Sequence, residues 1–245
     1  MKHLTFAQKL CVKRSGLVLQ RSKALWPGCR IGIAVSGGVD SFVLLKAMQI
    51  RKSILPFEIE IMAIHLNPGF DPLNHAGLLP WLASEGIPAH IELTNFGPYS
   101  HGPENTKASA CFLCSWLRRK RLFELCRQYR LTHLALGHNA EDLASTFMLN
   151  LLRNGNVRGM SINEGFFNGA LQLMRPLLLV EKKFIRQAAR QWDLPVWQNA
   201  CPSSGKTGRS EMERLIETIN TELPNARKSL LNGLGRWQLA KDSKE

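Results

Sequence analysis

The chain of 245 residues has few acidic side chains and no long apolar run. No segment approaches the roughly 20 consecutive apolar residues that a membrane helix requires, and residues 1–10 contain no apolar block typical of a signal peptide. Asp and Glu number 19 against 32 Lys and Arg, which gives a formal net charge of +13. We therefore expect a cytoplasmic protein with no membrane partner and with a polyanionic ligand.

The chain also lacks internal repeats and low-complexity tracts, and its 44% hydrophobic content is enough for one substantial core. Predicted strands and helices alternate along it. The strands are expected at 31–35, 57–66, 87–93, 131–136 and 170–174, and the helices at 6–26, 42–48, 74–85, 111–130, 138–151, 181–192, 211–220 and 225–237. Two segments without periodicity remain, 95–110 and 154–169, and the second is predicted to be a flexible lid or substrate loop.

This alternation predicts an α/β fold with a doubly wound, mostly parallel sheet of the Rossmann-like kind, which binds ligands at the carboxyl ends of its strands. Helical additions are expected at both ends. We divide the chain into a basic N-terminal helical segment (1–27), an α/β nucleotide-binding domain (28–200) and a C-terminal helical extension (201–245).

The most informative motif is Ser36-Gly37-Gly38-Val39-Asp40-Ser41, between a predicted strand and a predicted helix. It lacks both the Gly-Lys-Ser/Thr ending of a Walker loop and the glycine spacing of a dinucleotide site. Gly37 and Gly38 allow backbone NH groups to approach a phosphate, and Ser36 and Ser41 add hydroxyl donors. Asp40 either binds a divalent cation or caps the helix. The motif resembles the signature of the PP-loop ATP pyrophosphatases, which cleave ATP to AMP and pyrophosphate.

Three cysteines form the second candidate site. Cys111 and Cys114 stand at the start of a predicted helix, and Cys201 lies in a turn-rich segment. Their spacing leaves zinc, an iron-sulfur cluster, a thiol redox pair and unligated thiols open. The pair is followed by the basic run Arg118-Arg119-Lys120-Arg121. Such a cluster of positive charge favours a nucleic-acid partner.

The ordered set of motifs, which covers nearly the whole chain, resembles the tRNA 2-thiocytidine synthetase family, the cluster-dependent tRNA thiolation branch of the PP-loop enzymes. The segments that carry the resemblance are the 36–41 loop, Pro68-Gly69-Phe70 with Leu79-Pro80, residues 111–119, Leu136-Gly137-His138-Asn139-Ala140-Glu141-Asp142, Asn150, Gly159-Met160 and Arg175-Pro176-Leu177.

The resemblance implies an ATP-dependent tRNA sulfurtransferase. A four-iron four-sulfur cluster would be held by Cys111, Cys114 and Cys201, with one iron left open for the transferred sulfur. ATP would occupy the 36–41 loop, with magnesium on Asp40. Further contacts to nucleotide, magnesium or base are assigned to Gly137, His138, Arg175 and Asp142. The partners would be tRNA, most simply an anticodon-loop cytidine, a sulfur donor such as a cysteine desulfurase product, and a second copy in a homodimer.

Three positions depart from the family pattern. Ser204 replaces a later cysteine, which excludes a fourth thiol ligand there. Val39 replaces a loop lysine, so that a phosphate-neutralising cation must come from elsewhere, with Arg175 and Lys46 as candidates. Asn139 stands in place of a histidine.

Other functions stay open at this point. A lysidine-synthetase-like ligase also adenylates a cytidine but has no use for the three cysteines. Thiolation of a uridine is a closer rival, and a zinc-stabilised RNA-binding module with a vestigial nucleotide site is a rival without catalysis.

Overall fold

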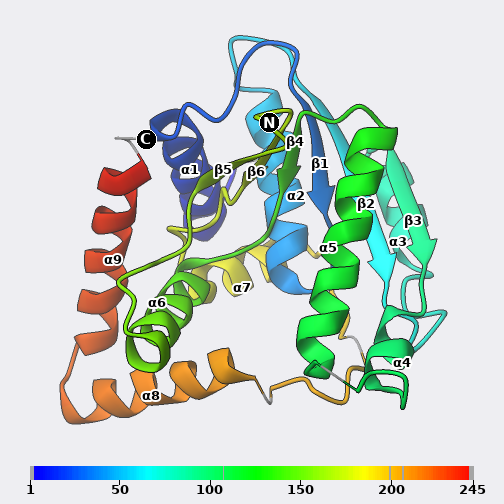
Figure 1. The fold of residues 1–245 in the computed structure, drawn as a ribbon. Coiled ribbons are helices and arrows are strands. Elements are labelled where there is room, and N and C mark those ends of the chain that lie inside the picture. The colour runs from blue at the N-terminus through cyan, green and yellow to red at the C-terminus, as the bar shows by residue number, and fades with distance from the viewer. Residues whose placement is uncertain (1–2, 107, 199, 206, 243–245) are drawn as a thin grey trace.

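The computed structural model describes residues 3–106, 108–198, 200–205 and 207–242. Its centre is a six-stranded sheet in the order β3-β2-β1-β4-β6-β5 (Figure 1). The strands are β1 (Arg30–Ala34), β2 (Glu60–Asn67), β3 (Ala89–Leu93), β4 (His133–Ala135), β5 (Asn163–Phe166) and β6 (Leu171–Met174). All neighbouring pairs are parallel except β5 with β6. The predicted doubly wound, mostly parallel sheet is therefore confirmed.

Nine helices are described around the sheet. They are α1 (Phe6–Arg21), α2 (Val39–Lys52), α3 (Leu78–Ser84), α4 (Phe96–His101), α5 (Ala110–Gln128), α6 (Ala140–Asn154), α7 (Lys182–Gln191), α8 (Gly208–Glu222) and α9 (Ala226–Asp242). Among the described residues, none of these helices combines the length and apolarity needed to cross a bilayer.

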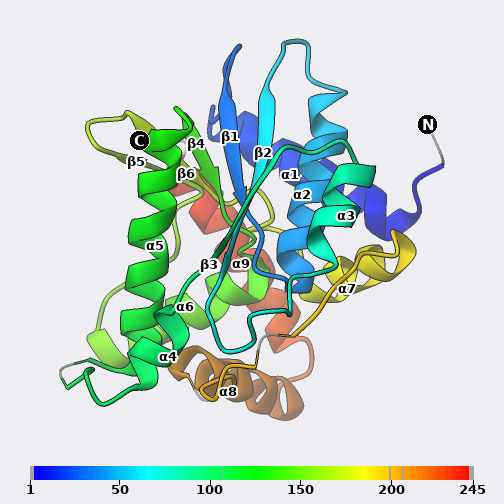
Figure 2. The ribbon, with the colours of Figure 1, turned by 90° about the vertical axis from the view of Figure 1, so that its right-hand side faces the viewer.

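Helices cover both faces of the sheet because both faces of its central strands are apolar. On one face, Ile31 and Ile33 of β1 pack with Phe42 and Leu45 of α2 in a core that also takes in α1, α3 and α7. The other face is covered by the C-terminal part of α5. Figure 2 shows this layering, with α5 on one side of the strands and α2 and α3 on the other.

A second core lies beside the sheet, where α8 and α9 pack against α6. This core contains Val18 of α1, Ala140 and Leu143 of α6, Ile216 of α8 and Leu234 of α9. It therefore joins residues from all three predicted segments. The division into domains stays a prediction.

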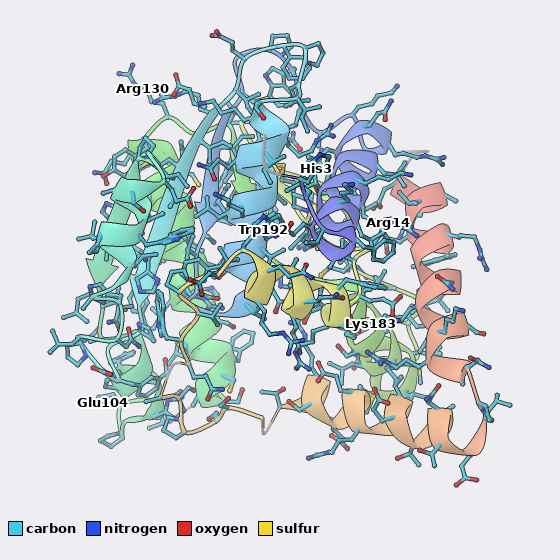
Figure 3. All side chains as sticks on the ribbon, turned by 180° about the vertical axis from the view of Figure 1, so that it is seen from behind. His3, Arg14, Glu104, Arg130, Lys183 and Trp192 are labelled. Carbon is cyan, nitrogen blue, oxygen red and sulfur yellow. The ribbon has the colours of Figure 1, made fainter. Side chains whose placement is uncertain are left out.

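Figure 3 views the molecule from behind, where Arg14 of α1 and Lys183 of α7 lie on the helical face. In the same view Glu104, shortly before α5, and Arg130, just after it, lie at opposite ends of the molecule. Helix α5 thus spans the height of the sheet. Its start lies at the edge where the parallel strands end, which is the edge that binds ligands in this class of fold.

Two sequence predictions need correction. The predicted lid, 154–169, contains the edge strand β5, which pairs antiparallel with β6 and packs Phe166 against Phe123. The segment 95–110 contains α4, although Pro and Gly hid its periodicity. In both places tertiary packing supplies the partners that short-range sequence patterns do not reveal.

Two buried histidines predict how stability depends on pH. His65 and His133 are 1% and 0% exposed, and burial lowers the pKa of each below its ordinary value near 6.5. As the pH falls below about 6.5, these two histidines become protonated in the unfolded chain but stay neutral in the folded chain. We expect the free energy of unfolding to fall by up to about 1.4 kcal/mol per pH unit for each ring.

Urea unfolding between about pH 7.5 and pH 5.5 measures this slope. His133→Gln removes one titrating ring, so its stability should depend less steeply on pH, whatever its absolute stability. A wild-type stability that stays flat over this range would contradict the prediction.

Candidate nucleotide and cysteine site

The glycine-rich loop between β1 and α2 is held in shape by its own hydroxyl groups. The backbone NH of Ser36 donates to the Ser41 Oγ at 3.1 Å, and the Ser41 Oγ donates to the Gly38 carbonyl oxygen at 2.8 Å. Gly38 caps α2 without any side-chain hydrogen bond. The first turn of α2 therefore presents backbone NH groups and the positive end of the helix dipole, which is the arrangement that binds a phosphate.

Trp197 covers this loop, and sequence analysis did not identify it. Its backbone NH donates to the Gly37 carbonyl oxygen at 3.0 Å, and a Cβ on Gly37 would lie 2.3 Å from the indole ring. Gly37 also has a φ of +89°, a conformation that L side chains rarely adopt. The indole packs edge-on against Phe42 and His65, with ring centroids 5.5 Å away in each case. No motif around Trp197 signals this position, because the contact joins residues 160 apart in sequence.

Gly137 brings the end of β4 against the start of α2. A Cβ at Gly137 would lie 3.1 Å from the backbone carbon of Asp40 and 3.1 Å from the nitrogen of Ser41. Only a residue without a side chain allows so close an approach without a shift. Packing alone therefore explains why glycine stands at position 137, independent of any contact with a ligand.

Asn139 links the two predicted carboxylates. It is the N-cap of α6: its Oδ1 accepts from the Asp142 backbone NH at 3.0 Å, and the Asp142 Oδ2 accepts from the Asn139 backbone NH at 2.9 Å. The Asn139 Nδ2 donates to the Asp40 Oδ1 at 3.1 Å. The residue that departs from the family pattern thus caps one helix and orients a carboxylate at the start of another.

The site around Asp40 is rich in carboxylates. Burial raises the pKa of Asp40, and the nearby Asp142 and Glu141 act in the same direction, whereas the Asn139 hydrogen bond and Lys182 oppose them. Glu141 is partly neutralised, since it accepts from Arg227 at 2.6 Å. A buried carboxylate with acidic neighbours gains from a cation, so the location suits a metal-bound phosphate.

His138 lies in strongly positive surroundings. Burial lowers its pKa to about 3, and four arginines add to this effect, Arg175, Arg209, Arg118 and Arg119. The imidazole is therefore neutral near pH 7. Its buried Nδ1 has no partner among the described residues, which leaves a hydrogen-bonding atom available to a ligand.

The two cations proposed to replace a loop lysine differ in position. Lys46 pairs with Glu85 at 2.5 Å and is engaged there. Arg175 donates to the Ser161 carbonyl oxygen at 2.5 Å and lies 3.7 Å from Glu164, but its buried Nε has no partner among the described residues. Of the two, Arg175 is the one close enough to His138 to lower its pKa.

The cysteines come from two segments. Cys111 and Cys114 lie in the first two turns of α5, and Cys201 lies in the segment before α8. The Ser203 hydroxyl, two residues on, makes a hydrogen bond of 2.9 Å with the His101 Nε2 of α4. All three thiols are free and partly exposed.

The three thiols are close enough to influence one another. The pKa of Cys114 is raised chiefly by burial, Arg118 opposes the shift, and the thiols of Cys201 and Cys111 add to it. Within the part of the chain that the structure describes, no three His, Cys, Asp or Glu side chains are grouped for a single metal ion. The electrostatic coupling is compatible with a shared inorganic group, and the identity of that group stays a prediction.

The thiols and the nucleotide loop share one edge of the sheet. Arg118 of α5 acts on both Cys114 and His138, while Gly137 beside His138 touches the first turn of α2. By contrast, a cavity of about 670 Å³ lined by Gln49, Lys52, Pro56 and Glu58 lies at the opposite end of β2. The chemistry of the side chains, not cavity size, locates the site.

The double role of Asn139 can be separated by mutation. Asn139→Ala removes both the helix cap and the donor to Asp40, so we expect it to lower the free energy of unfolding by about 1 to 2 kcal/mol. Asn139→Ser keeps a capping oxygen but loses the donor, and should recover most of this stability in urea unfolding. Because the lost hydrogen bond had lowered the pKa of Asp40, magnesium-dependent ATP binding by Asn139→Ser should weaken most at low pH. Equal destabilisation by both variants would contradict the capping role.

Comparisons with known proteins agree with this geometry. Residues 103–207 match the model of a PP-loop domain family. The chain is 31% identical over 92% of its length to the tRNA-cytidine(32) 2-sulfurtransferase of Geotalea uraniireducens, covering 90% of that protein. The enzyme of the same name from Geobacter metallireducens is 31% identical over 86% of this chain, and the match covers 83% of that enzyme.

A solved structure confirms the fold. The U34-tRNA thiolase NcsA of Methanococcus maripaludis, solved with its 4Fe-4S cluster, superposes with a TM-score of 0.72. The match covers 94% of this chain and 80% of that one at 21% identity. Taken with the curated relatives, these matches exclude the reading as a non-catalytic RNA-binding module. The chain belongs to the tRNA-cytidine(32) 2-sulfurtransferase family, tRNA-thiolating enzymes of the PP-loop ATP pyrophosphatase type.

Proposed function

We propose that this protein replaces the C2 oxygen of an anticodon-loop cytidine in tRNA with sulfur, using ATP and a cluster held by Cys111, Cys114 and Cys201. The names of the relatives support the substrate. The observation that carries the proposal is the shared neighbour Arg118, whose charge acts on both Cys114 and His138. One charge that acts on both groups supports a location of the thiols near the nucleotide loop.

The loop residues suit ATP. The uncapped start of α2 and the glycines offer backbone NH groups to the β- and γ-phosphates, and would stabilise the charge that grows on the leaving pyrophosphate. Asp40, oriented by Asn139, would hold magnesium beside these phosphates. Arg175 and the other arginines near His138 supply the positive charge that the loop, with Val39, does not.

The three thiols suit a cluster with three protein ligands. They come from two segments fixed independently, Cys111 and Cys114 by α5 and Cys201 by the segment that Ser203 ties to α4. Arg118 opposes the rise in the pKa of Cys114, and so favours the thiolate that a metal requires. When bound, such a cluster would offer an open iron to the sulfur atom that a separate donor provides.

The reaction needs two bond exchanges. The C2 oxygen attacks the α-phosphorus, so that an O–P bond forms and the bond to pyrophosphate breaks. Sulfur then bonds to C2, and the C–O bond breaks with release of AMP. The neutral ring of His138 can form a hydrogen bond with the nucleotide through its unpartnered Nδ1. Trp197 packs on Gly37 and would help to keep water from the adenylate.

Several finer assignments stay predictions. They are the identity of the modified nucleotide, a sulfur donor such as the product of a cysteine desulfurase, a homodimer and a cytoplasmic location. The contribution of Asp142 to magnesium binding also stays a prediction, since its observed role is in the α6 cap.

Loss of one thiol should separate the two steps. Cys201→Ser, purified without oxygen, should lose the visible absorbance of the cluster and at least about 100-fold of the thiolation rate, while tRNA-dependent release of pyrophosphate persists. Cys11→Ala is the control. It alters a buried cysteine of α1 that packs against α7, and it should keep both the cluster absorbance and the thiolation rate. Full thiolation by Cys201→Ser would refute the ligand assignment.

The proposed reaction as a whole is tested in cells. Deleting the gene should remove 2-thiocytidine from digested tRNA, and mass spectrometry of the nucleosides measures it. Loss of a 2-thiouridine instead would favour uridine thiolation, and loss of lysidine would favour the ligase. An unchanged nucleoside profile would overturn the proposal.

A further inference from the structure

The N-terminal part of α5 projects beyond the sheet. The helix has 19 residues, but its buried residues are Leu122, Leu125 and Cys126, all in its last third. Cys111, Cys114 and Arg118 continue the same stripe toward the helix start, where they face the candidate site instead of a core. The outer side of this projecting part has no packing role that would explain its composition.

Two large aromatic side chains lie on that outer side. Phe112 is 63% exposed and Trp116 is 50% exposed, and they stand one turn apart on the helix. At about 100° per residue, the Phe112 side chain is directed about a quarter of a turn away from that of Cys111, and the Trp116 side chain about 140° away, on the side of the helix that faces away from the thiols. Neither ring belongs to any of the three core clusters formed by the described residues. Single exposed apolar residues are ordinary, but an exposed aromatic pair on the helix that also carries two of the candidate thiols indicates a ligand.

The charge around the pair indicates which ligand. Lys120 lies over the Trp116 ring, with its Nζ 5.7 Å from the ring centroid. Arg121 is engaged by Glu92 and Glu124, whereas Arg119 and Lys120, which share the outer side of the helix with the two rings, form no ion pair among the described residues. Flat aromatic rings interleaved with unpaired cations are what single-stranded nucleic acid requires, because bases stack on the rings while phosphates meet the cations.

A second copy of this chain is the alternative occupant. Two copies joined through this surface would bring Arg119 and Lys120 of each copy together, in a protein of net charge +13. Like charges in contact oppose such an association. The charge of the surface therefore favours RNA over self-association.

We propose that Phe112 and Trp116 form a stacking platform for unpaired bases of the tRNA anticodon loop that neighbour the target nucleotide. The proposal rests on the proposed function and specifies how its substrate is held. Stacking on the outer side of α5 would hold the anticodon loop on the same helix that carries two of the thiols. It would also let the enzyme select a loop over a duplex, since paired bases cannot stack on protein side chains.

The test compares two RNA probes of equal length, an anticodon stem-loop and a fully paired duplex, in equilibrium binding without ATP. Trp116→Ala and Phe112→Ala should each weaken stem-loop binding about tenfold and leave duplex binding unchanged. Trp116→Phe should keep most of the affinity, whereas Trp116→Leu, apolar but without a π-face, should lose it. The dependence of binding on salt should stay the same in these variants, while Lys120→Ala should make it shallower.

Phe167→Ala is the matched control. Phe167 is 64% exposed, like Phe112, but lies in the turn between β5 and β6, and this variant should bind both probes as the wild type does. Because Phe112 and Trp116 are exposed, their variants should unfold at the wild-type urea concentration.

The outcomes are distinguishable. If the wild type thiolates tRNA and the alanine variants bind the stem-loop unchanged, the platform is wrong and the proposed function stands. Equal losses on the duplex, or full binding by Trp116→Leu, also overturn the platform. If sedimentation shows that the variants convert a wild-type dimer to monomers, the surface joins two copies instead. A wild type that neither binds nor thiolates tRNA overturns both proposals.

Discussion

The close approach of Gly137 to the first turn of α2 is the constraint on which the candidate site depends. Parallel pairing of β1 with β4 ends both strands at the same edge, and the missing side chain lets the following segments touch. The starts of α2 and α6 therefore lie together, and Asn139 can reach Asp40. A larger residue at 137 would push against the backbone of Asp40 and Ser41, and so shift the phosphate loop relative to His138 and the carboxylates.

Charge is divided across this site in a way that suits its chemistry. Carboxylates gather at the helix starts, where Asp40 has Asp142 and Glu141 as neighbours. Arginines from α5, α8 and the end of β6 gather around His138. Carboxylates suit a divalent cation, and arginines suit phosphate groups. Burial, with the nearby arginines as a smaller cause, lowers the pKa of His138 and keeps a neutral hydrogen-bonding group beside both regions.

Helix α5 connects the parts of the proposed mechanism. Its C-terminal third is fixed in the core by Leu122 and Leu125, and this anchorage holds the projecting part rigidly. That part carries two of the three thiols, the basic run and the exposed aromatic pair. A single helix can thus present cluster ligands on one side and an RNA-binding surface on another, since successive side chains point in different directions.

The sequence alone determined the class of fold, because alternating helices and strands favour parallel pairing. It also predicted a phosphate-binding loop and grouped Cys201 with Cys111 and Cys114, and the electrostatic coupling of the thiols supports this second prediction. Three contacts were decided only by the tertiary structure. They are the ion pair between Lys46 and Glu85, the packing of Trp197 on Gly37 and the hydrogen bond from Asn139 to Asp40. Each joins residues far apart in the chain, so their meeting depends on how strands and helices pack, which no local pattern encodes.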